Sequence, residues 1–174
     1  MICKNYVSKI LNTMFGLSGN ISRPEFVYMG LCTTEPNDVN GQVIDEPTAT
    51  SYERKLVGGE GLGVQYFGTR TTEADGKVNI KSNAELGVIE NTAEIQFKTA
   101  REAWTTNGTK LYYWFLSTYA KKPSSIANGG CDAMVWGVIK DINKQDGIEV
   151  PQDTVPTFYE EQLKASIDVP LDEN

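Results

Sequence analysis

The chain has 174 residues, of which 40% are hydrophobic and 22% charged, and its formal net charge at pH 7 is -7. This length and composition are typical of one globular domain with a sizeable core and exclude a disordered chain. Nucleic acids and anionic lipid surfaces are bound through Lys and Arg, so an acidic chain without a basic run is expected to bind neither. No stretch is long and apolar enough to predict membrane insertion.

Histidine is absent from the sequence, and this absence limits the chemistry that the chain can perform. It excludes nucleophiles activated by His within this chain and removes the commonest ligand of zinc and non-haem iron. Cys3, Cys32 and Cys131 are widely spaced, so we expect free, mostly buried thiols rather than a metal site. The first residues lack the features of a signal peptide, which predicts synthesis in a reducing cytoplasm. We therefore expect no enzyme activity, no metal site and no cofactor.

Residues 2–15 repeat apolar side chains at a spacing of four, which predicts a short amphipathic helix. The repeat consists of Ile2, Tyr6, Ile10 and Met14, and Gly16 and Gly19 follow it as helix stops. Two interpretations stay open. Either the helix covers an edge or an end of the domain, or it is an arm that docks on a neighbouring molecule.

Residues 26–33 carry apolar side chains on both alternating faces, which predicts a central strand with cover on each side. A turn-rich surface loop is expected over 34–51, followed by a second strand over 52–57. The glycine-rich run 58–63 precedes a strand-like pattern rather than a helix, so we expect no phosphate binding there. Residues 69–91 alternate only weakly and predict a hairpin or a mobile excursion.

Two later segments, 111–119 and 132–139, are apolar on both faces and predict neighbouring strands at the centre of the fold. Residues 92–98 and 162–171 alternate apolar and polar side chains, which predicts strands with one buried face. The sequence thus contains about eight strands after one helix.

This pattern predicts an all-β protein, a β-sandwich or jelly-roll-like fold with a short N-terminal helix. The sequence shows no internal repeat, no low-complexity run and no linker. We therefore expect residues 1–20 to form an N-terminal helical arm and residues 21–174 to form a single β-sandwich domain.

Two acidic segments could carry chemistry, and each also has a plainer interpretation. The segment 141–147 resembles a calcium-binding loop, but its acidic residues are out of step with the ligand spacing, so a hairpin turn is favoured. Asp45, Glu46 and Glu53 could supply a carboxylate pair. Nothing in the sequence fixes the geometry of these carboxylates, so a solvated loop is the favoured interpretation.

Several short motifs resemble those of small bacteriophage virion structural proteins. The first group of motifs consists of YMGLCTTEP at 28–36, the pair Glu46-Pro47, and Tyr52 and Arg54 spaced as YxR. The second group consists of NTAEIQF at 91–97 and of GIEVP at 147–151, which is followed by Phe158. The family includes proteins of the tail-fibre, minor tail and capsid-surface types. The excursion at 58–88 is longer than in the family pattern, and the N-terminal helix is an addition to it.

The resemblance implies a β-sandwich subunit of a virion that is made in the cytoplasm of a bacterial host and works by protein–protein assembly. Its expected partners are further copies of itself and other virion proteins. The alternative is a jelly-roll module that binds a carbohydrate or a receptor, such as a glycan on the host surface. Aromatic residues exposed in a cleft would favour this alternative, whereas apolar surface buried between subunits would favour assembly.

The sequence contains more apolar strand faces than the core of a two-sheet sandwich needs, since the outer faces of such sheets are mainly polar. We therefore expect a homo-oligomer, a trimer or a larger ring, because closed symmetry is the usual outcome of self-association. The residues expected at the assembly interface are Tyr6, Ile10, Tyr112, Trp114 and Trp136.

Overall fold

The computed structural model describes residues 1–17, 24–58, 67–68, 70–72, 78–80, 88–91, 93–106, 108–141, 143, 145–160 and 162–166. These residues contain one helix, α1 (Lys4–Met14), and eleven strands. The strands are β1 (Val27–Cys32), β2 (Lys55–Gly58), β3 (Phe67–Gly68), β4 (Arg70–Thr72), β5 (Val78–Ile80), β6 (Val88–Asn91), β7 (Ile95–Gln96), β8 (Tyr113–Ser117), β9 (Ala133–Val138), β10 (Thr157–Phe158) and β11 (Lys164–Ser166). The all-β prediction with a short N-terminal helix is confirmed.

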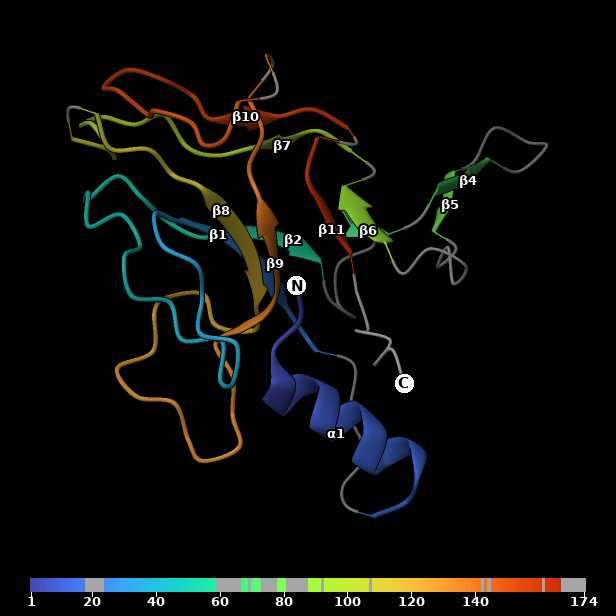
Figure 1. Cartoon of the computed structure of the whole chain (residues 1–174). Helices are drawn as coiled ribbons and strands as arrows, with labels where there is room; N and C mark the ends of the chain where they lie inside the picture. Colours follow the sequence, from blue (N-terminus) through green and yellow to red (C-terminus); the bar gives the residue numbers. More distant parts are fainter. Residues whose placement is uncertain are drawn as a thin grey trace, which may run out of the picture.

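The main sheet has four antiparallel strands in the order β2-β1-β8-β9 (Figure 1). The predicted central strand 26–33 is β1, and the two segments predicted to be apolar on both faces are the neighbouring strands β8 and β9. Consecutive residues of β8 and β9 are buried, as expected for strands covered on both faces. The predictions that these two strands are neighbours and are covered on both faces are therefore confirmed, but β9 lies at the edge of the main sheet and only β8 lies inside it.

The close packing within this sheet depends on one glycine. Gly30 of β1 lies directly across from Phe115 of β8. A Cβ atom at Gly30 would lie 2.1 Å from the end of the Phe115 ring, so only glycine leaves room for this side chain.

The N-terminal segment closes the outer edge of β9. Ile2 pairs with Val135 in an antiparallel bridge, and the backbone N–H of Cys3 donates to the carbonyl of Met134 at 2.9 Å. An open strand edge presents unpaired N–H and C=O groups, and this short segment satisfies part of that edge.

The remaining strands form three smaller antiparallel sheets, ordered β11-β6-β3, β10-β7 and β4-β5. The alternation predicted over 92–98 is confirmed, because Ile95 and Phe97 are buried while Gln96 and Lys98 are exposed. In the predicted last strand, Leu163 and Ala165 are buried as expected, and residues 167–174 lie outside the described part.

Other predictions have mixed outcomes. The described residues form eleven strands in four sheets, so the predicted count of about eight strands is not reproduced. Part of the segment 69–91 forms the antiparallel pair β4-β5, in keeping with the predicted hairpin. The glycine-rich run 58–63 lies almost wholly outside the described residues. At 141–147 the chain turns back on itself, with Lys140 bridged to Asp146, which confirms the hairpin turn.

Candidate functional site

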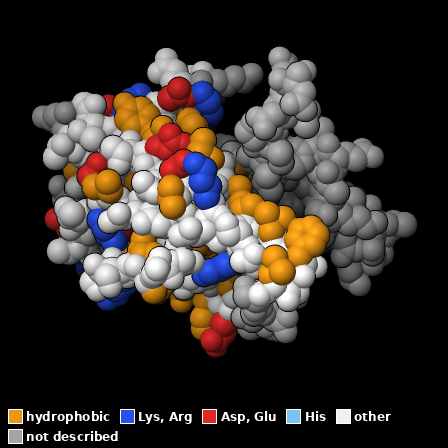
Figure 2. Space-filling view, turned by 60° about the horizontal axis from the view of Figure 1, so that its bottom comes forward, with side chains coloured by type: hydrophobic (Ala, Val, Ile, Leu, Met, Phe, Trp, Pro, Cys, Tyr) orange, Lys and Arg blue, Asp and Glu red, His pale blue; other side chains and the backbone are white. Residues whose placement is uncertain are grey.

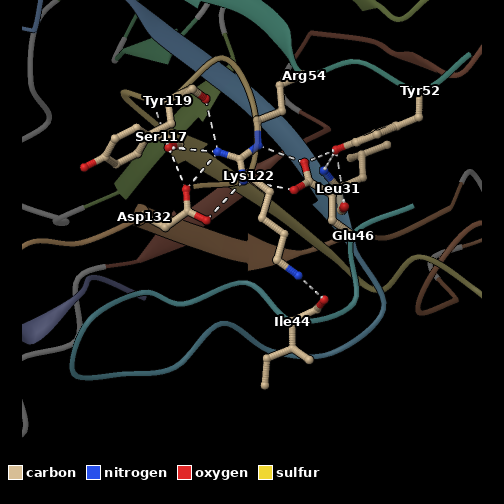
Figure 3. Close-up of polar contacts among 9 residues, drawn as sticks. All are labelled: Leu31, Ile44, Glu46, Tyr52, Arg54, Ser117, Tyr119, Lys122 and Asp132. Carbon is tan, nitrogen blue, oxygen red and sulfur yellow. Dashed lines mark hydrogen bonds and ion pairs between the residues drawn. The ribbon is translucent and has the colours of Figure 1, made fainter. Parts of the chain in front are cut away.

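A buried polar cluster lies at one end of the main sheet, and we call it the Arg54 cluster (Figure 3). Its members are Glu46 from the loop after β1, Tyr52 and Arg54 from the segment before β2, Ser117 at the end of β8, and Asp132 just before β9. The side chain of Arg54 is 1% exposed, that of Glu46 6% and that of Asp132 1%.

The guanidinium of Arg54 binds two carboxylates in a two-pronged manner. Its Nε and Nη2 donate to the two carboxylate oxygens of Glu46 at 2.8 and 2.9 Å, and its Nη1 and Nη2 donate to those of Asp132 at 2.8 and 3.1 Å. Nη1 also donates to the Ser117 hydroxyl and to the Tyr119 carbonyl, each at 3.1 Å. This geometry uses the planar fork of Arg and could not be reproduced by Lys.

Two carboxylates face one guanidinium, so the cluster carries one excess negative charge that needs further donors. The Tyr52 hydroxyl donates to Glu46 at 2.8 Å, and the Ser117 hydroxyl donates to Asp132 at 2.9 Å. The guanidinium of Arg54 also lies over the ring of Phe115, 4.8 Å from its centroid. Every buried charge therefore has partners, which is the condition under which buried charges are tolerated.

Burial and hydrogen bonding act in opposite directions on the pKa of Arg54. Burial lowers it, but hydrogen bonds to Glu46 and Asp132 outweigh burial and raise it above the usual value. For Tyr52, burial is the main cause and the charge of Glu46 adds to it, so the pKa of this phenol lies well above 10. Both groups therefore keep their protons throughout the neutral range.

The cluster joins segments that are distant in sequence, and its role in the chain is to hold them together. Asp132 lies 78 residues after Arg54, and Ser117 lies 63 residues after it. The loop after β1 and the ends of β8 and β9 are thereby fixed to one side chain. Lys122 adds a tether at the surface, where its ammonium donates to the Ile44 carbonyl at 2.6 Å.

The structure corrects the interpretation of Glu46 as part of a solvated loop. Its carboxylate is buried because Arg54 and Tyr52 neutralise and hydrogen-bond it. Asp45 and Glu53 are exposed as expected, and Glu53 forms an ion pair with Lys98. Glu46, Tyr52 and Arg54 were visible in the sequence as part of a resemblance, but nothing in the sequence showed that Asp132 completes their site.

The five residues expected at an assembly interface fall into two groups. Tyr112 is exposed, and Tyr6 and Ile10 of α1 are half-buried. Trp114 and Trp136 are 0% and 1% exposed, because the chain itself covers both faces of β8 and β9. These two indole rings are therefore core residues and do not lie on a surface available to a partner.

Exposed apolar residues cluster on the far half of α1 and just after it, although others are scattered over the body. No side chain of this helix is buried, and its exposed apolar residues include Leu11 and Met14. Phe15 follows directly after the helix and Leu17 two residues later, and both are exposed. Figure 2 turns the α1 side of the molecule toward the viewer and shows hydrophobic side chains on that face.

A second surface feature is a cavity of about 480 Å³ beside β9 and β11. Its lining includes the aromatic residues Tyr113 and Trp136 and the polar residues Glu35, Gln162 and Lys164. The indole N–H of Trp136 donates to Glu35 at 3.2 Å. A cavity of this size with a few polar groups is large enough for a small ligand.

The part of the chain that the structure describes contains no group of three or more Cys, Asp or Glu side chains placed to hold a metal ion. Cys3, Cys32 and Cys131 are free and buried, as expected. Among the same residues, no helix has both the length and the apolar character needed to cross a membrane.

Comparison with known proteins gives one family match. The family described as "Podophage GP4 fiber I protein gp80" matches residues 2–118, about two thirds of the chain. The match spans α1, β1, β2 and β8 and includes four members of the Arg54 cluster, while Asp132 lies beyond it. No curated protein matches the chain. The resemblance to phage virion structural proteins is therefore confirmed.

Proposed function

The chain belongs to the podophage fibre protein family that matches residues 2–118, and we propose that it is a structural subunit of a phage fibre that acts by protein–protein assembly. The observation that carries this proposal is the extent of the match, which includes both the helical arm and the core of the main sheet. Family membership supports a structural role in the virion. Self-assembly, partner proteins and the absence of catalysis are the parts that we propose.

The structure supports an assembly role in two ways. The Arg54 cluster and the covered strands of the main sheet make a rigid body. Its buried ion pairs hold two long loops, the one after β1 through Glu46 and the one before β9 through Asp132. Outside this body, α1 presents apolar side chains to solvent. A rigid body with an exposed apolar arm suits a subunit that binds neighbours, because large exposed apolar patches on monomers are uncommon and mark interaction sites.

We further propose that the four sheets make up a β-sandwich-like body spanning residues 21–174, with residues 1–20 as the arm. The assembled form is a homo-oligomer, a trimer or a larger ring, within a virion made in the cytoplasm of a bacterial host. The subunit works without a cofactor and without catalysis, since histidine is absent from the whole sequence and each charged group of the Arg54 cluster is hydrogen-bonded to other members of the cluster.

The test is to locate the chain in purified phage particles. Gold-labelled antibody against the chain should mark fibres in negative-stain images, and quantitative mass spectrometry should find it at a fixed copy number per particle. If the chain is abundant in infected cells but absent from washed particles, the structural role is wrong.

The cavity beside β9 and β11 supports a second candidate, a module that binds a carbohydrate. Tyr113 offers an aromatic surface there, and Glu35 and Gln162 offer hydrogen-bonding groups suited to sugar hydroxyls. This function predicts binding on an array of bacterial surface glycans, and loss of that binding in Tyr113→Ala. An array without any signal, obtained with protein that assembles normally, would leave the assembly role alone.

A further inference from the structure

The helix α1 is attached to the rest of the chain almost entirely through its first turn. The N–H groups at the start of a helix have no partner within the helix. Here the N–H of Lys4 donates to the Asp38 carbonyl at 2.9 Å, and that of Asn5 donates to the Val39 carbonyl at 3.0 Å. The side chain of Asn5 also donates to the Gly130 carbonyl at 2.9 Å. The start of α1 is therefore fixed on the body.

The far half of α1 lacks such support. Leu11, Met14 and Phe15 are 45%, 72% and 72% exposed, and no side chain of the helix is buried. A helix of 11 residues is marginally stable in water without packing of its apolar face. The C-terminal end is nonetheless well formed, since Gly16 adopts a φ of +67° and the N–H of Leu17 donates to the Asn12 carbonyl at 2.8 Å.

The apolar residues along this side of the helix have the spacing of a docking face, with Val7 half-buried and the later ones exposed. Val7, Leu11 and Met14 follow one another at i, i+4 and i+7, and Phe15 lies four residues after Leu11. Helices that bind in a groove use anchors at these positions. Leu17 extends the apolar surface beyond the end of the helix, where it is 74% exposed.

Charge indicates which kind of surface this face fits. Residues 1–17 contain Lys4 and Lys9 and no acidic side chain, so their side chains carry +2. Lys4 pairs with Asp38 of the same chain, so of these two lysines it is Lys9 that can face a partner. The whole chain carries -7, so residues 18–174 carry -7 minus +2, which is -9. A basic, apolar arm is thus complementary to the acidic body of another copy, whereas two arms of like charge repel each other.

We propose that α1 and the residues after it, up to residue 17, form a docking arm whose face, made by Leu11, Met14, Phe15 and Leu17, packs on the acidic body of a second copy of this chain. The proposal rests on the assembly function proposed above and names the surface that performs it. Because the arm of one copy binds the body of the next, the contact is heterologous. Repetition of such a contact closes a ring when a whole number of copies completes a rotation of 360°. A ring of this kind is the closed form expected here.

The first test compares oligomeric states by light scattering. In the arm variant, Leu11→Gln, Met14→Gln and Phe15→Gln are combined, since Gln keeps helix propensity and removes the apolar face. In the matched control, Ile44→Gln, Val155→Gln and Tyr159→Gln change three comparably exposed residues of the body. We expect wild type and control to have a multiple of 19.2 kDa, and the arm variant to fall to 19.2 kDa.

Thermal unfolding of all three proteins checks that the arm variant keeps a folded body. An arm variant with the mass of wild type would overturn the proposal, and so would a wild-type chain that stays monomeric on concentration. Failure of the proposed function is a separate result, because it is read from the absence of the chain in purified particles.

The second test identifies the surface that the arm contacts. Equal amounts of ¹⁴N- and ¹⁵N-labelled protein are mixed, dissociated, reassembled and treated with a zero-length carbodiimide cross-linker. We expect mixed-isotope links between Lys9 and carboxylates of the body, since the arm itself has no acidic residue. The ion pair of Lys4 with Asp38 lies within one chain at 2.6 Å and supplies the control, because its links should carry a single isotope. Links from Lys9 in single-isotope form alone would overturn the proposal.

Discussion

Replacing Arg54 by Met removes the only cation from a cluster that holds two buried carboxylates. Glu46 and Asp132 would keep their burial but lose four hydrogen bonds from the guanidinium, at 2.8 to 3.1 Å in the native protein. Met fills a similar volume, so the change tests charge compensation rather than packing. We predict that Arg54→Met is among the most destabilising single substitutions in the chain.

The magnitude follows from the burial of the partners. Breaking a buried ion pair by removing one partner costs about 3–5 kcal/mol, because the remaining charge stays desolvated. For a domain of this size each kcal/mol lowers the unfolding midpoint by about 2–4 °C, so the expected loss is about 6–20 °C. Arg54→Lys should lose less, since it keeps the charge but not the two-pronged hydrogen bonds.

Differential scanning calorimetry of the purified variants measures this effect. The combination Arg54→Met, Glu46→Gln and Asp132→Asn removes the two uncompensated charges and should recover part of the lost stability. Lys98→Met breaks the exposed ion pair with Glu53 and should leave the midpoint unchanged. If Arg54→Met unfolds at the wild-type temperature, the cluster does not hold the loops, and the account of the site is wrong.

Three further predictions concern the core, a turn and the thiols. Trp136→Ala should cost about 3–5 kcal/mol in denaturant unfolding, because the ring is 1% exposed. Gly41→Ala should lower the thermal midpoint, since Gly41 has a φ of +63° and a Cβ atom there would lie 2.0 Å from the Ala133 carbonyl oxygen. Gly108→Ala should lower the midpoint less, because Gly108 has a φ of +79° but open space around its Cα atom. Burial and the neighbouring Cys3 raise the pKa of the Cys131 thiol from 9.0 to about 12. The contribution of the protonated Cys131 thiol to the free energy of unfolding is therefore full below pH 9 and is lost as the pH rises toward 12. A thiol reagent at pH 8 should label the native protein slowly, because its three cysteines are buried, and the unfolded protein at all three cysteines.

The sequence predicted the elements whose side chains repeat at the period of their own secondary structure. The helix over 2–15 and the alternating strand over 92–98 were found in this way. The strands over 26–33, 111–119 and 132–139 were found by a different signal, as short runs that are apolar on both faces. The hairpin turn at 141–147 was found because its turn residues act locally. Strand count and sheet arrangement were less accessible, since strands as short as Ile95–Gln96 exist only where a distant partner pairs with them.

The errors at the two tryptophans and at Glu46 have a common physical cause. Whether a side chain is buried depends on neighbours that are far away in sequence. Trp136 was expected to exceed the capacity of one core, yet the chain covers it and Glu35 accepts its N–H, although the two residues are 101 positions apart. Glu46 was read as solvated because Asp132, which shares its guanidinium, lies far along the chain. One chain can therefore cover more polar and aromatic surface internally than its local sequence pattern indicates.

One turn connects the Arg54 cluster to the arm, and this connection explains how an exposed helix can keep a defined direction. On one side of the 38–41 turn, the carbonyls of residues 38 and 39 accept the first N–H groups of α1. On its other side, the carbonyls of Asn40 and Gly41 accept the N–H groups of Asp132 and Ala133 at 3.1 and 2.9 Å. Asp132 is itself held by Arg54. The buried charges thus fix the start of β9, the turn and the first turn of α1 as one unit. In the proposed assembly a second copy would meet a helix that is already oriented, so less conformational entropy would be lost on binding.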